Sequence, residues 1–330
     1  MAKFSGSPRI SVALCTYNGS RYIAEQVTSI LRQQMPVSEI VLSDDASADD
    51  TVAIVEGVMS DWPSPGPELQ IIRNSRALGV TANFEQAALA CTGDFIALSD
   101  QDDLWHTDKI ASILQLFEER PEVDLVHTDA ALVDIHGGRM PGALLASLDA
   151  KPSELREIHA GRGYETLLRR NLVTGATVVF RRSLLDRAVP FAPDWVHDEW
   201  LAIVAAATSG IDVIQRELID YRQHGGNQIG ARSLSLREKF GRLSEPRAGR
   251  NRRLLARTHE LHERLVALGA SPEAVALAAG KLAHENFRSA LPGVRVARLP
   301  AVIAAWGAGT YGRFSRGVID VARDLLQPAD

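Results

Sequence analysis

The chain has 330 residues, of which 45% are hydrophobic, and a formal net charge of −5 at pH 7. This length predicts about two domains, or one large domain with an appendage. The small net charge gives no reason to expect a nucleic-acid partner. Cys15 and Cys91 are its only cysteines, so a disulfide framework is not expected. Residues 1–8 lack the apolar region of a signal peptide, and no run approaches the ~18 apolar residues of a membrane span. We therefore expect a cytoplasmic protein.

Short apolar runs alternate with segments of helical period in the first half of the chain. Strands are predicted at Arg9–Leu14, Glu39–Ser43, Leu69–Arg73, Phe95–Ser99 and Val123–His127. Helices are predicted at Arg21–Gln34, Thr51–Met59, Val80–Ala90 and Thr107–Arg120. This alternation is typical of βαβ units, so we predict an α/β fold with a mostly parallel sheet.

The second half is less regular. Asp134–Gly163 contains a Gly-Gly pair and two prolines, and we predict a long loop over one face of the domain. A buried helix is expected at Glu199–Thr208, and strands are expected at Leu172–Arg181, Ile211–Ile214 and Leu218–Tyr221. From residue 231 the pattern becomes helical and basic, which places a domain boundary between residues 230 and 231.

Three carboxylates crowd at the end of one predicted strand. Asp100, Asp102 and Asp103 directly follow the apolar run Phe95–Leu98. Such close like charges repel one another unless a cation lies among them. Magnesium commonly takes one or two carboxylates together with substrate phosphates. The run therefore predicts metal-assisted chemistry on a phosphorylated substrate, and the alternative is a solvated acidic turn that caps the next helix.

Two further polar clusters follow the first and second predicted strands, Cys15–Gly19 and Ser43–Ser47. In open parallel sheets, ligands bind at the carboxyl ends of the strands. A Tyr there can stack on a nucleobase, and an Asp can accept a hydrogen bond from a base or ribose; turn and N-cap chemistry is the alternative for the aspartates. Neither GxGxxG nor GxxxxGK[ST] is present, so the usual phosphate cradles are missing. The clusters favour a nucleotide held through a metal.

Taken together, these segments resemble the GT-A-fold glycosyltransferases of family 2. The resemblance spans roughly residues 8–230 and lies in Val12–Gly19, Val41–Asp49, Leu78–Phe84, Ile96–Trp105, Asn171–Ala176, Trp195–Trp200 and Tyr221–Gln228. The residues of two segments, Asp100–Trp105 and Arg222–Gln228, are most similar to the corresponding motifs of bacterial rhamnosyltransferases of surface-polysaccharide assembly. The resemblance implies a GT-A catalytic domain over residues 1–230, with a Rossmann-like sheet flanked by helices, and a helical C-terminal appendage over residues 231–330.

The resemblance also implies a divalent cation, Mn²⁺ or Mg²⁺, as cofactor. Asp102 is then a direct ligand, Asp100 lies near the ribose and the metal, and Asp103 faces the donor sugar or the acceptor. His224 completes the metal shell, and its imidazole suits manganese better than magnesium. Arg222 pairs with phosphate or with an acid near the base. Trp105 either walls the sugar site or belongs to the core.

For the proton transfer, the resemblance implies Asp198 as general base, with its neighbour Glu199 as the competing candidate. A carboxylate is ionised at neutral pH and can take the proton of an acceptor hydroxyl. The alternative for Asp198 is an acid at a helix N-terminus, stabilised by the helix dipole. The small residues Thr174 and Gly175 are expected to line the acceptor side.

The expected nucleotide site comes from the remaining matched positions. Its residues are Thr16, Tyr17, Asn18, Asp44 and Asp45, with one of the two aspartates contacting the base, and Arg76 and Asn83 for the phosphates or sugar. The implied function is an inverting, metal-dependent transfer of a sugar, with rhamnose favoured, from a donor such as dTDP-rhamnose to a saccharide or lipid-linked acceptor. The alternatives are a UDP-sugar donor, a non-catalytic nucleotide- or glycan-binding protein, and a sugar nucleotidyltransferase. The last would need a Gly- and Arg-rich loop where Cys15–Gly19 stands.

The C-terminal region is basic. Between residues 231 and 260, nine Lys or Arg stand against three Glu. The simpler interpretation is a helix pair packed on the catalytic domain or on a second subunit, as in a homodimer. The alternative is contact with anionic lipid at the inner face of the membrane, to which each basic residue contributes about 1 kcal/mol. Leu299–Trp306, with Tyr311 and Phe314, would suit an interfacial or dimer-forming helix.

Overall fold

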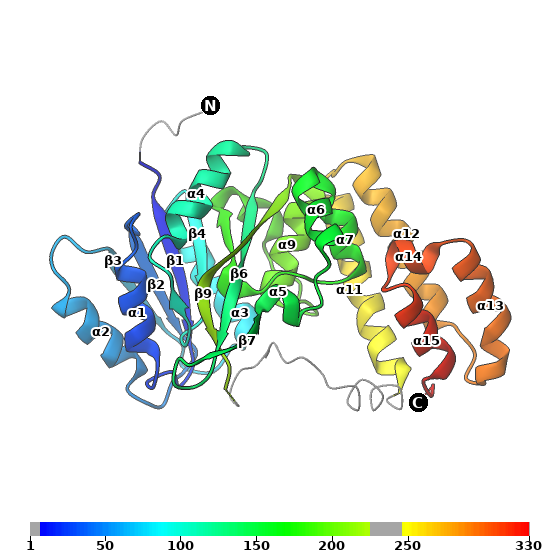
Figure 1. Ribbon diagram of the computed structural model, residues 1–330, viewed down its shortest axis with the longest axis horizontal. Helices are drawn as coiled ribbons and strands as arrows, with labels where there is room; N and C mark the ends of the chain where they lie inside the picture. The colour runs from blue at the N-terminus through cyan, green and yellow to red at the C-terminus, as the bar shows by residue number, and fades with distance from the viewer. Residues whose placement is uncertain (1–6, 225–245, 330) are drawn as a thin grey trace.

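A nine-stranded sheet forms the centre of the fold (Figure 1). The computed structural model describes residues 7–224 and 246–329. The strand order is β3-β2-β1-β4-β8-β6-β9-β5, and β7 pairs with β6 beside this path. The strands are β1 (Ile10–Thr16), β2 (Glu39–Asp44), β3 (Glu68–Arg73), β4 (Phe95–Ser99), β5 (Leu104–Trp105), β6 (Leu125–Val133), β7 (Arg139–Ala143), β8 (Val179–Arg181) and β9 (Ile211–Arg222).

Helices connect the strands and continue beyond the sheet. Within residues 7–224 they are α1 (Ile23–Leu31), α2 (Thr51–Asp61), α3 (Val80–Ala90), α4 (Lys109–Glu119), α5 (Leu144–Ser147), α6 (Pro152–Glu157), α7 (Gly163–Arg169), α8 (Leu185–Ala188) and α9 (His197–Thr208), with short π or 3₁₀ turns η1 (Ile158–Arg162), η2 (Gly175–Thr177) and η3 (Arg182–Leu184). The C-terminal helices are α11 (Arg247–Ala267), α12 (Pro272–Ser289), α13 (Arg295–Gly307), α14 (Thr310–Phe314) and α15 (Val318–Leu326). The four helices predicted in the first half are confirmed within a few residues at each end.

The first half of the sheet is parallel, as the alternation of strands and helices predicts. β1 pairs in parallel with β2 on one side and with β4 on the other. Their registers place Thr16 opposite Asp44 and Leu14 opposite Ser99. The carboxyl ends of the three strands therefore lie side by side, and the polar segments that follow them meet at one edge of the sheet.

Beyond β4 the sheet is mixed. β8 runs antiparallel to both β4 and β6, whereas β9 runs parallel to β6 with register shifts between Thr128 and Ala131. The two short strands predicted at 211–214 and 218–221 are one strand, β9, because the polar residues between them keep an extended backbone across the bulged register. The strand predicted at 172–181 is confined to β8, because η2 turns the chain: the N–H of Thr177 donates to the carbonyl of Thr174 at 2.9 Å.

The prediction of a long loop at Asp134–Gly163 is wrong. After a tight turn at Asp134–Gly138, β7 pairs antiparallel with β6, and α5, α6 and η1 follow. Their apolar residues are buried, among them Leu144, Leu155 and Ile158. α5 is four residues long and α6 is six residues long. Both are too short to show a helical period in the sequence.

Two apolar clusters cover the two faces of the sheet. Side chains alternate between faces along a strand. Val12 and Leu14 of β1 accordingly pack with α1, α2 and α4, whereas Ala13 and Cys15 pack with α3, α7 and α9. β1 thus carries apolar residues on both faces, which is expected of a sheet covered by helices on both sides.

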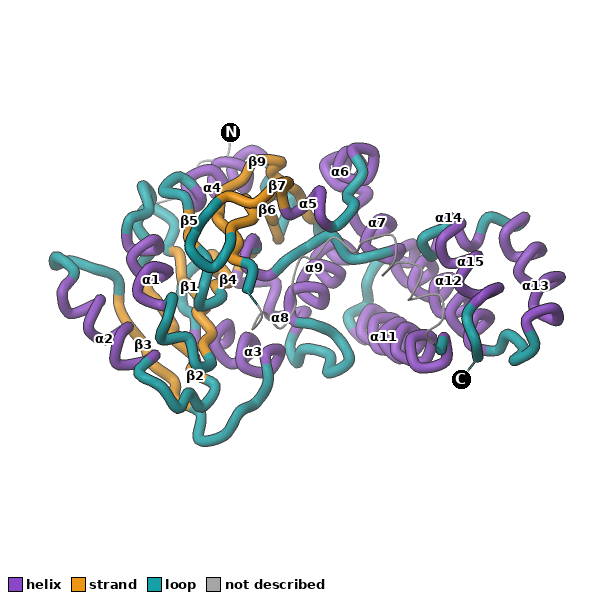
Figure 2. Tube along the Cα trace, turned by 60° about the horizontal axis from the view of Figure 1, so that its bottom comes forward, coloured by secondary structure: helices purple, strands orange, loops and turns teal. Residues whose placement is uncertain are grey.

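The C-terminal helices lie at one end of the molecule, beside α7 and α9 and far from β2 and β3 (Figures 1 and 2). α11 contacts α9, and α12 and α14 contact α7. Leu261 and Leu265 of α11 belong to the same apolar cluster as α9. The described part of this region is therefore packed on the α/β region that carries the sheet, while the predicted boundary between residues 230 and 231 lies outside the described residues.

The solvent face of α13 is apolar. Val296, Leu299, Ile303 and Trp306 are 73%, 41%, 58% and 52% exposed. Tyr311 and Phe314, which the sequence grouped with this surface, are instead buried between the C-terminal helices or against α7 and are not part of it. Among the described residues, no helix is both long and apolar enough to cross a membrane.

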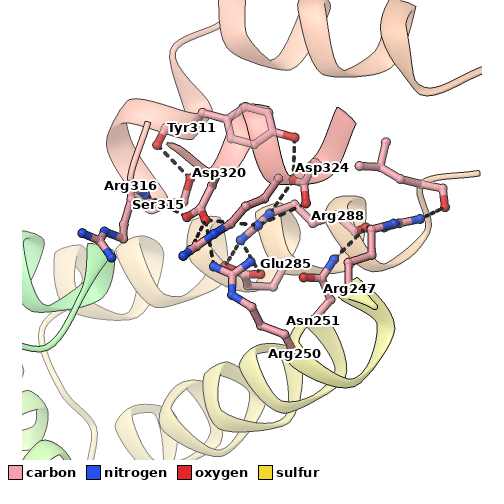
Figure 3. A network of polar contacts seen from close by, with 12 residues as sticks. Arg247, Arg250, Asn251, Glu285, Arg288, Tyr311, Ser315, Arg316, Asp320 and Asp324 are labelled. Carbon is pink, nitrogen blue, oxygen red and sulfur yellow. Dashed lines mark hydrogen bonds and ion pairs between the residues drawn. The ribbon is translucent and has the colours of Figure 1, made fainter. Parts of the chain in front are cut away.

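Buried charges hold the C-terminal helices together (Figure 3). The Arg288 guanidinium of α12 donates from Nε to Asp324 Oδ2 at 2.7 Å and lies 3.3 Å from Glu285 and 3.7 Å from Asp320. Arg250 of α11 donates to Asp320 Oδ1 at 2.8 Å. A buried charge is stable only when it has a partner. These contacts therefore fix α11, α12 and α15 relative to one another.

Candidate active site

A pocket of about 370 Å³ lies at the carboxyl ends of β1, β2 and β4. Its wall brings together many of the residues singled out from the sequence: Thr16, Tyr17, Asp45, Asn83, Asp100, Asp102, Thr174, Gly175, Asp198 and Glu199. These residues come from β1, α3, α9, η2 and the loops after β2 and β4. Strand ends that are far apart in the sequence thus supply one site.

Asp44 and Asp45 have different environments. The Asp44 carboxylate accepts hydrogen bonds from Thr16 Oγ1 at 2.8 Å and from the N–H of Ser47 at 2.9 Å, and it does not line the pocket. Asp45 does line the pocket, and it accepts from the N–H groups of Leu78 and Gly79 at 2.7 and 2.9 Å. Of the two aspartates, Asp45 is therefore placed to meet a ligand, while Asp44 holds the turn.

Gln101 joins the loop after β1 to the acidic run. Its Oε1 accepts from the N–H of Tyr17 at 2.8 Å, and its Nε2 donates to the Tyr17 carbonyl at 3.1 Å. A Cβ at Gly19 would lie 2.6 Å from Gln101 Cδ, so a larger residue there would displace the Gln101 side chain from these hydrogen bonds. The Tyr17 ring itself is 49% exposed at the pocket. The sequence analysis did not include Gln101 among the site residues. Its position between Asp100 and Asp102 could have indicated that it lies at the site.

The acidic run is crowded and partly buried. Burial, followed by the neighbouring charges of Asp102 and Asp198, raises the pKa of Asp100 to about 7. Asp103 lies behind the pocket: its Oδ1 accepts from the N–H of Arg222 at 3.0 Å, and its Oδ2 has no hydrogen-bond partner within the described ranges 7–224 and 246–329. Burial, followed by the charges of Asp102 and Asp100, also raises the pKa of Asp103. Carboxyls in this arrangement favour a cation beside them.

His224 approaches the acidic run from the end of β9. Its Nε2 lies 2.7 Å from Asp102 Oδ2, and its ring stacks on Tyr22 with the centroids 5.4 Å apart. Within residues 7–224 and 246–329, no three His, Cys, Asp or Glu side chains converge as a metal site. Asp102 and His224 are two potential ligands that lie side by side, and a divalent ion can complete its shell with phosphate oxygens and water. Residues 225–228 of the matched motif lie outside the described part of the chain.

Asp198 begins the first turn of α9 and lies at the pocket wall. Its Oδ2 accepts from the N–H of Gly175 at 2.7 Å, and its Oδ1 accepts from the N–H of Glu199 at 2.7 Å. Burial raises the pKa of Asp198 to about 6, while these hydrogen bonds act in the opposite direction. A Cβ at Gly175 would lie 2.8 Å from His197 Nε2, so glycine allows η2 to approach α9. The predicted acceptor side and the predicted base are thus in direct contact.

His197 also lines the pocket, although the sequence analysis gave it no role. Its ring stacks on Phe84 with a centroid distance of 3.9 Å and an interplanar angle of 15°. Burial lowers its pKa to about 3, so the ring is neutral, and neither ring nitrogen has a hydrogen-bond partner among the described residues. Asn171, another pocket residue, belonged to a matched segment but was likewise not selected.

Several predicted residues do not reach the pocket. The Arg222 guanidinium turns away to pair with Glu25 at 2.8 Å and to donate to the Asp102 carbonyl at 2.8 Å. Trp105 is buried beneath Lys109, whose Nζ lies 3.7 Å from the ring centroid. Outside the pocket wall lie Asn18, Asp44, Arg76, Asp103, Trp105, Arg222 and His224, the last connected to the pocket through Asp102.

Comparisons with known proteins identify the family to which the chain belongs. The model of the family "Glycosyl transferase family 2" matches residues 11–187. The dTDP-rhamnosyl transferase RfbG of Shigella flexneri is 27% identical over 239 residues, which are 70% of this chain and 78% of the relative. An uncharacterized glycosyltransferase of Nostoc sp. is 26% identical over 222 residues, and the match spans 66% of each chain, slightly less than two thirds of that relative.

Solved structures share the fold. TarS 1-349 of S. aureus, in complex with UDP-GlcNAc, has a TM-score of 0.56 at 16% identity, covering 96% of this chain and 89% of that one. The mannosyltransferase PcManGT from Pyrobaculum calidifontis, in complex with GDP-Man and Mn²⁺, has a TM-score of 0.50 at 19% identity, covering 92% and 77%. The family model covers more than half of the chain. The chain therefore belongs to glycosyltransferase family 2, and its fold is the GT-A fold.

Proposed function

We propose that this protein is an inverting glycosyltransferase that moves rhamnose from dTDP-rhamnose to a hydroxyl of a saccharide or lipid-linked acceptor in bacterial surface-polysaccharide synthesis. The observation that carries the proposal is one pocket wall containing both the acidic pair Asp100 and Asp102 and the buried carboxyl of Asp198. Rhamnose is supported by the name of the Shigella relative. The second candidate is a UDP-sugar donor, supported by the UDP-GlcNAc complex of TarS.

In this proposal the nucleotide occupies the end of the pocket formed by the loops after β1 and β2. The exposed ring of Tyr17 offers a stacking surface for the base, and Asp45 offers a carboxylate acceptor for a base or ribose donor. Thr16 and Asn83 line the same end. Arg76 lies outside the pocket wall. We therefore assign binding of the donor phosphates to the acidic run and to the cation that it would hold.

Asp102 and His224 would hold a divalent cation, with Asp100 beside it. The Asp103 Oδ2, which has no partner in the part of the chain that the structure describes, and the raised pKa of Asp100 both fit a positive charge beside the acidic run. The Mn²⁺ complex of the mannosyltransferase supports the same assignment. When bound, the ion would supply positive charge that stabilises the departing nucleoside diphosphate.

Asp198 would act as the general base. The acceptor oxygen forms a bond to the anomeric carbon while the bond from that carbon to the diphosphate breaks, and the hydroxyl proton passes to the carboxylate of Asp198. Each carboxylate oxygen accepts one backbone N–H and keeps a lone pair for this proton. A base with a pKa near the working pH is efficient.

The test is a thermal-shift panel of dTDP-, UDP- and GDP-sugars with Mn²⁺ or Mg²⁺, followed by a transfer assay with the stabilising donor. We expect the largest shift with dTDP-rhamnose and near-complete loss of transfer in Asp102→Asn and Asp198→Asn, with the fold retained by circular dichroism. Stabilisation by UDP-sugars alone would contradict the donor assignment. Nucleotide binding without any transfer would favour the non-catalytic alternative.

We also propose that α13 contacts an anionic membrane surface. Residues 231–330 contain 17 Lys and Arg against 9 Asp and Glu, and residues 289–319 contain four Arg and no acid. The exposed apolar face of α13 lies within that stretch, a combination typical of interfacial helices. A homodimer through the same face is the alternative.

Flotation with phosphatidylglycerol vesicles tests the membrane contact. We expect the wild type to float and Ile303→Glu to remain in solution. Val266→Glu, at an exposed residue of α11, is the matched control and should float. Sedimentation as a dimer that Ile303→Glu converts to a monomer, without flotation, would contradict the membrane contact and support the dimer.

A further inference from the structure

We infer that Arg257 of α11 is a positioning residue of the catalytic centre, because it holds the first turn of α9 and engages Glu199, leaving Asp198 as the carboxylate available to the acceptor. The inference rests on the proposed role of Asp198. It assigns to the C-terminal helices a part in catalysis in addition to any contact with lipid or with a second subunit.

Arg257 makes three contacts with the segment that leads into α9. Its guanidinium forms an ion pair with Glu199 and lies 4.0 Å over the Trp195 ring centroid. Its backbone carbonyl accepts a hydrogen bond from Trp195 Nε1 at 3.0 Å. One turn of α11 therefore contacts residues on both sides of Asp198 in the sequence.

Arg264 repeats this arrangement two turns later on α11. Seven residues separate the two arginines, so they lie on the same face of the helix. The guanidinium of Arg264 donates to the carbonyls of Arg187 and Val189 at 3.0 Å each and to that of Pro190 at 2.7 Å. The segment 187–199, which carries the proposed base, is thus held by α11 at both of its ends.

The two carboxyls at the start of α9 are distinguished by these contacts. Glu199 has the Arg257 partner, whereas the hydrogen bonds to Asp198 come from the N–H groups of Gly175 and Glu199. Removal of Arg257 would leave Glu199 as a mostly buried carboxylate without that partner, which is costly. Glu199 would then compete with Asp198 for protons and for nearby N–H donors.

The charges around Asp198 also indicate that Arg257 influences this carboxyl. The titratable and charged groups that face it are Asp100 from the loop after β4, His197 and Glu199 on α9, and Arg257 from α11. Burial raises the pKa of both Asp198 and Glu199, and the charge of Arg257 lowers both. Loss of that charge is therefore expected to raise the pKa of Asp198 further.

The experiment compares Arg257→Met with two matched variants. Arg253→Met removes an exposed arginine one turn earlier on α11 and makes the same change in net charge. Arg257→Lys keeps the charge but loses the planar guanidinium that lies over Trp195. The first readout needs no substrate: the pKa of Asp198 is measured by NMR on protein carrying ¹³C-labelled aspartate, with the resonance assigned by Asp198→Asn.

The second readout is kcat with dTDP-rhamnose over the same pH range. We expect Arg257→Met to raise the pKa of Asp198 and to reduce kcat roughly 10- to 100-fold, the cost of a misplaced reacting group. Arg257→Lys should keep the wild-type pKa while losing part of kcat, and Arg253→Met should match the wild type in both. Circular dichroism and thermal unfolding confirm that each variant is folded.

The inference is overturned if Arg257→Met, or Arg257→Lys where the first does not fold, leaves kcat equal to that of Arg253→Met. It is also overturned if a folded Arg257→Met leaves the pKa of Asp198 unchanged. Full turnover in Asp198→Asn would instead refute the proposed function, and the NMR titration would still report whether Arg257 sets the ionisation of that carboxyl.

Discussion

At the scale of single residues, burial sets the pH range of the proposed base. Burial raises the pKa of Asp198 to about 6, so below that pH the carboxyl is increasingly protonated and cannot accept a proton. We expect kcat/KM to fall about tenfold per pH unit below about pH 6 and to level off above about pH 7. Asp198→Asn should lower kcat by roughly 10²- to 10⁴-fold. A rate profile that stays flat down to about pH 5 would contradict this role.

Gly175 tests the contact between η2 and α9. A Cβ there would lie 2.8 Å from His197 Nε2 and 3.5 Å from Asp198 Oδ2. We expect Gly175→Ala to lower kcat by about 100-fold with little change in nucleotide affinity, because relief of the clash with His197 shifts η2, whose Gly175 N–H is hydrogen-bonded to the base. Gly249→Ala on α11 is the control, since a Cβ there meets nothing within 4 Å. Equal kcat in the two variants would show that this contact does not position the base.

The sequence predicted the location of the site better than the direction of its side chains. Polar residues at strand ends predict a ligand edge, because parallel strands share that edge. Neighbouring residues leave a strand in different directions, so only the structure separates Asp45, in the pocket, from Asp44, under the turn. Trp105 and Arg222 belong to matched motifs yet are buried away from the pocket. Trp105 lies beneath Lys109, and Arg222 pairs with Glu25, which is distant in the sequence.

At the scale of loops and elements, Gln101 carries a prediction about donor binding. Its side-chain amide makes two hydrogen bonds to the backbone of Tyr17, each worth about 1 kcal/mol. We expect Gln101→Ala to weaken dTDP binding by roughly tenfold, measured by calorimetry, with kcat nearly unchanged at saturating donor. Gln115→Ala on the exposed face of α4 should bind dTDP as the wild type does. A fall in kcat without a change in affinity would refute the prediction.

Elements were predictable where their pattern was long enough to repeat. α3 and β4 have the predicted bounds, and the other early helices differ only at their ends. α5 and α6 were missed because each is six residues or shorter, too short to show a helical period. β7 was missed because Arg139–Ala143 contains no apolar run, and the strand forms through its pairing with β6. The antiparallel pairing of β8 was also not predictable, since strand direction depends on where the chain returns to the sheet.

At the scale of the whole molecule, the buried charges between the C-terminal helices should determine their stability. Arg288→Met would leave Asp324 and Glu285 buried without this partner, and breaking such pairs costs about 3–5 kcal/mol. We expect a lower urea midpoint by circular dichroism. Arg295→Met, at an exposed position on α13, should leave the midpoint unchanged. Equal midpoints in both variants would mean that apolar packing alone holds these helices together.

Charge is divided unequally between the two regions of the molecule. Residues 1–230 contain 19 Lys and Arg against 32 Asp and Glu, while residues 231–330 have the opposite balance. The basic character of the C-terminal helices could be predicted from composition. Their contact with α9 could not be predicted, because Glu199 and Arg257 are 58 residues apart and no local pattern connects them.

The contact between Arg257 and the start of α9 has a consequence for how this enzyme could be recombined with others. The family match ends at residue 187, before both partners of that contact. A chimaera that combines residues 1–230 with the helices of another family member would keep the donor pocket, yet it would inherit the ion pair only if a guanidinium faced Glu199. Exchange of the C-terminal helices would therefore yield folded donor-binding proteins with slow transfer. Introduction of an arginine that faces Glu199 would be expected to restore the transfer rate.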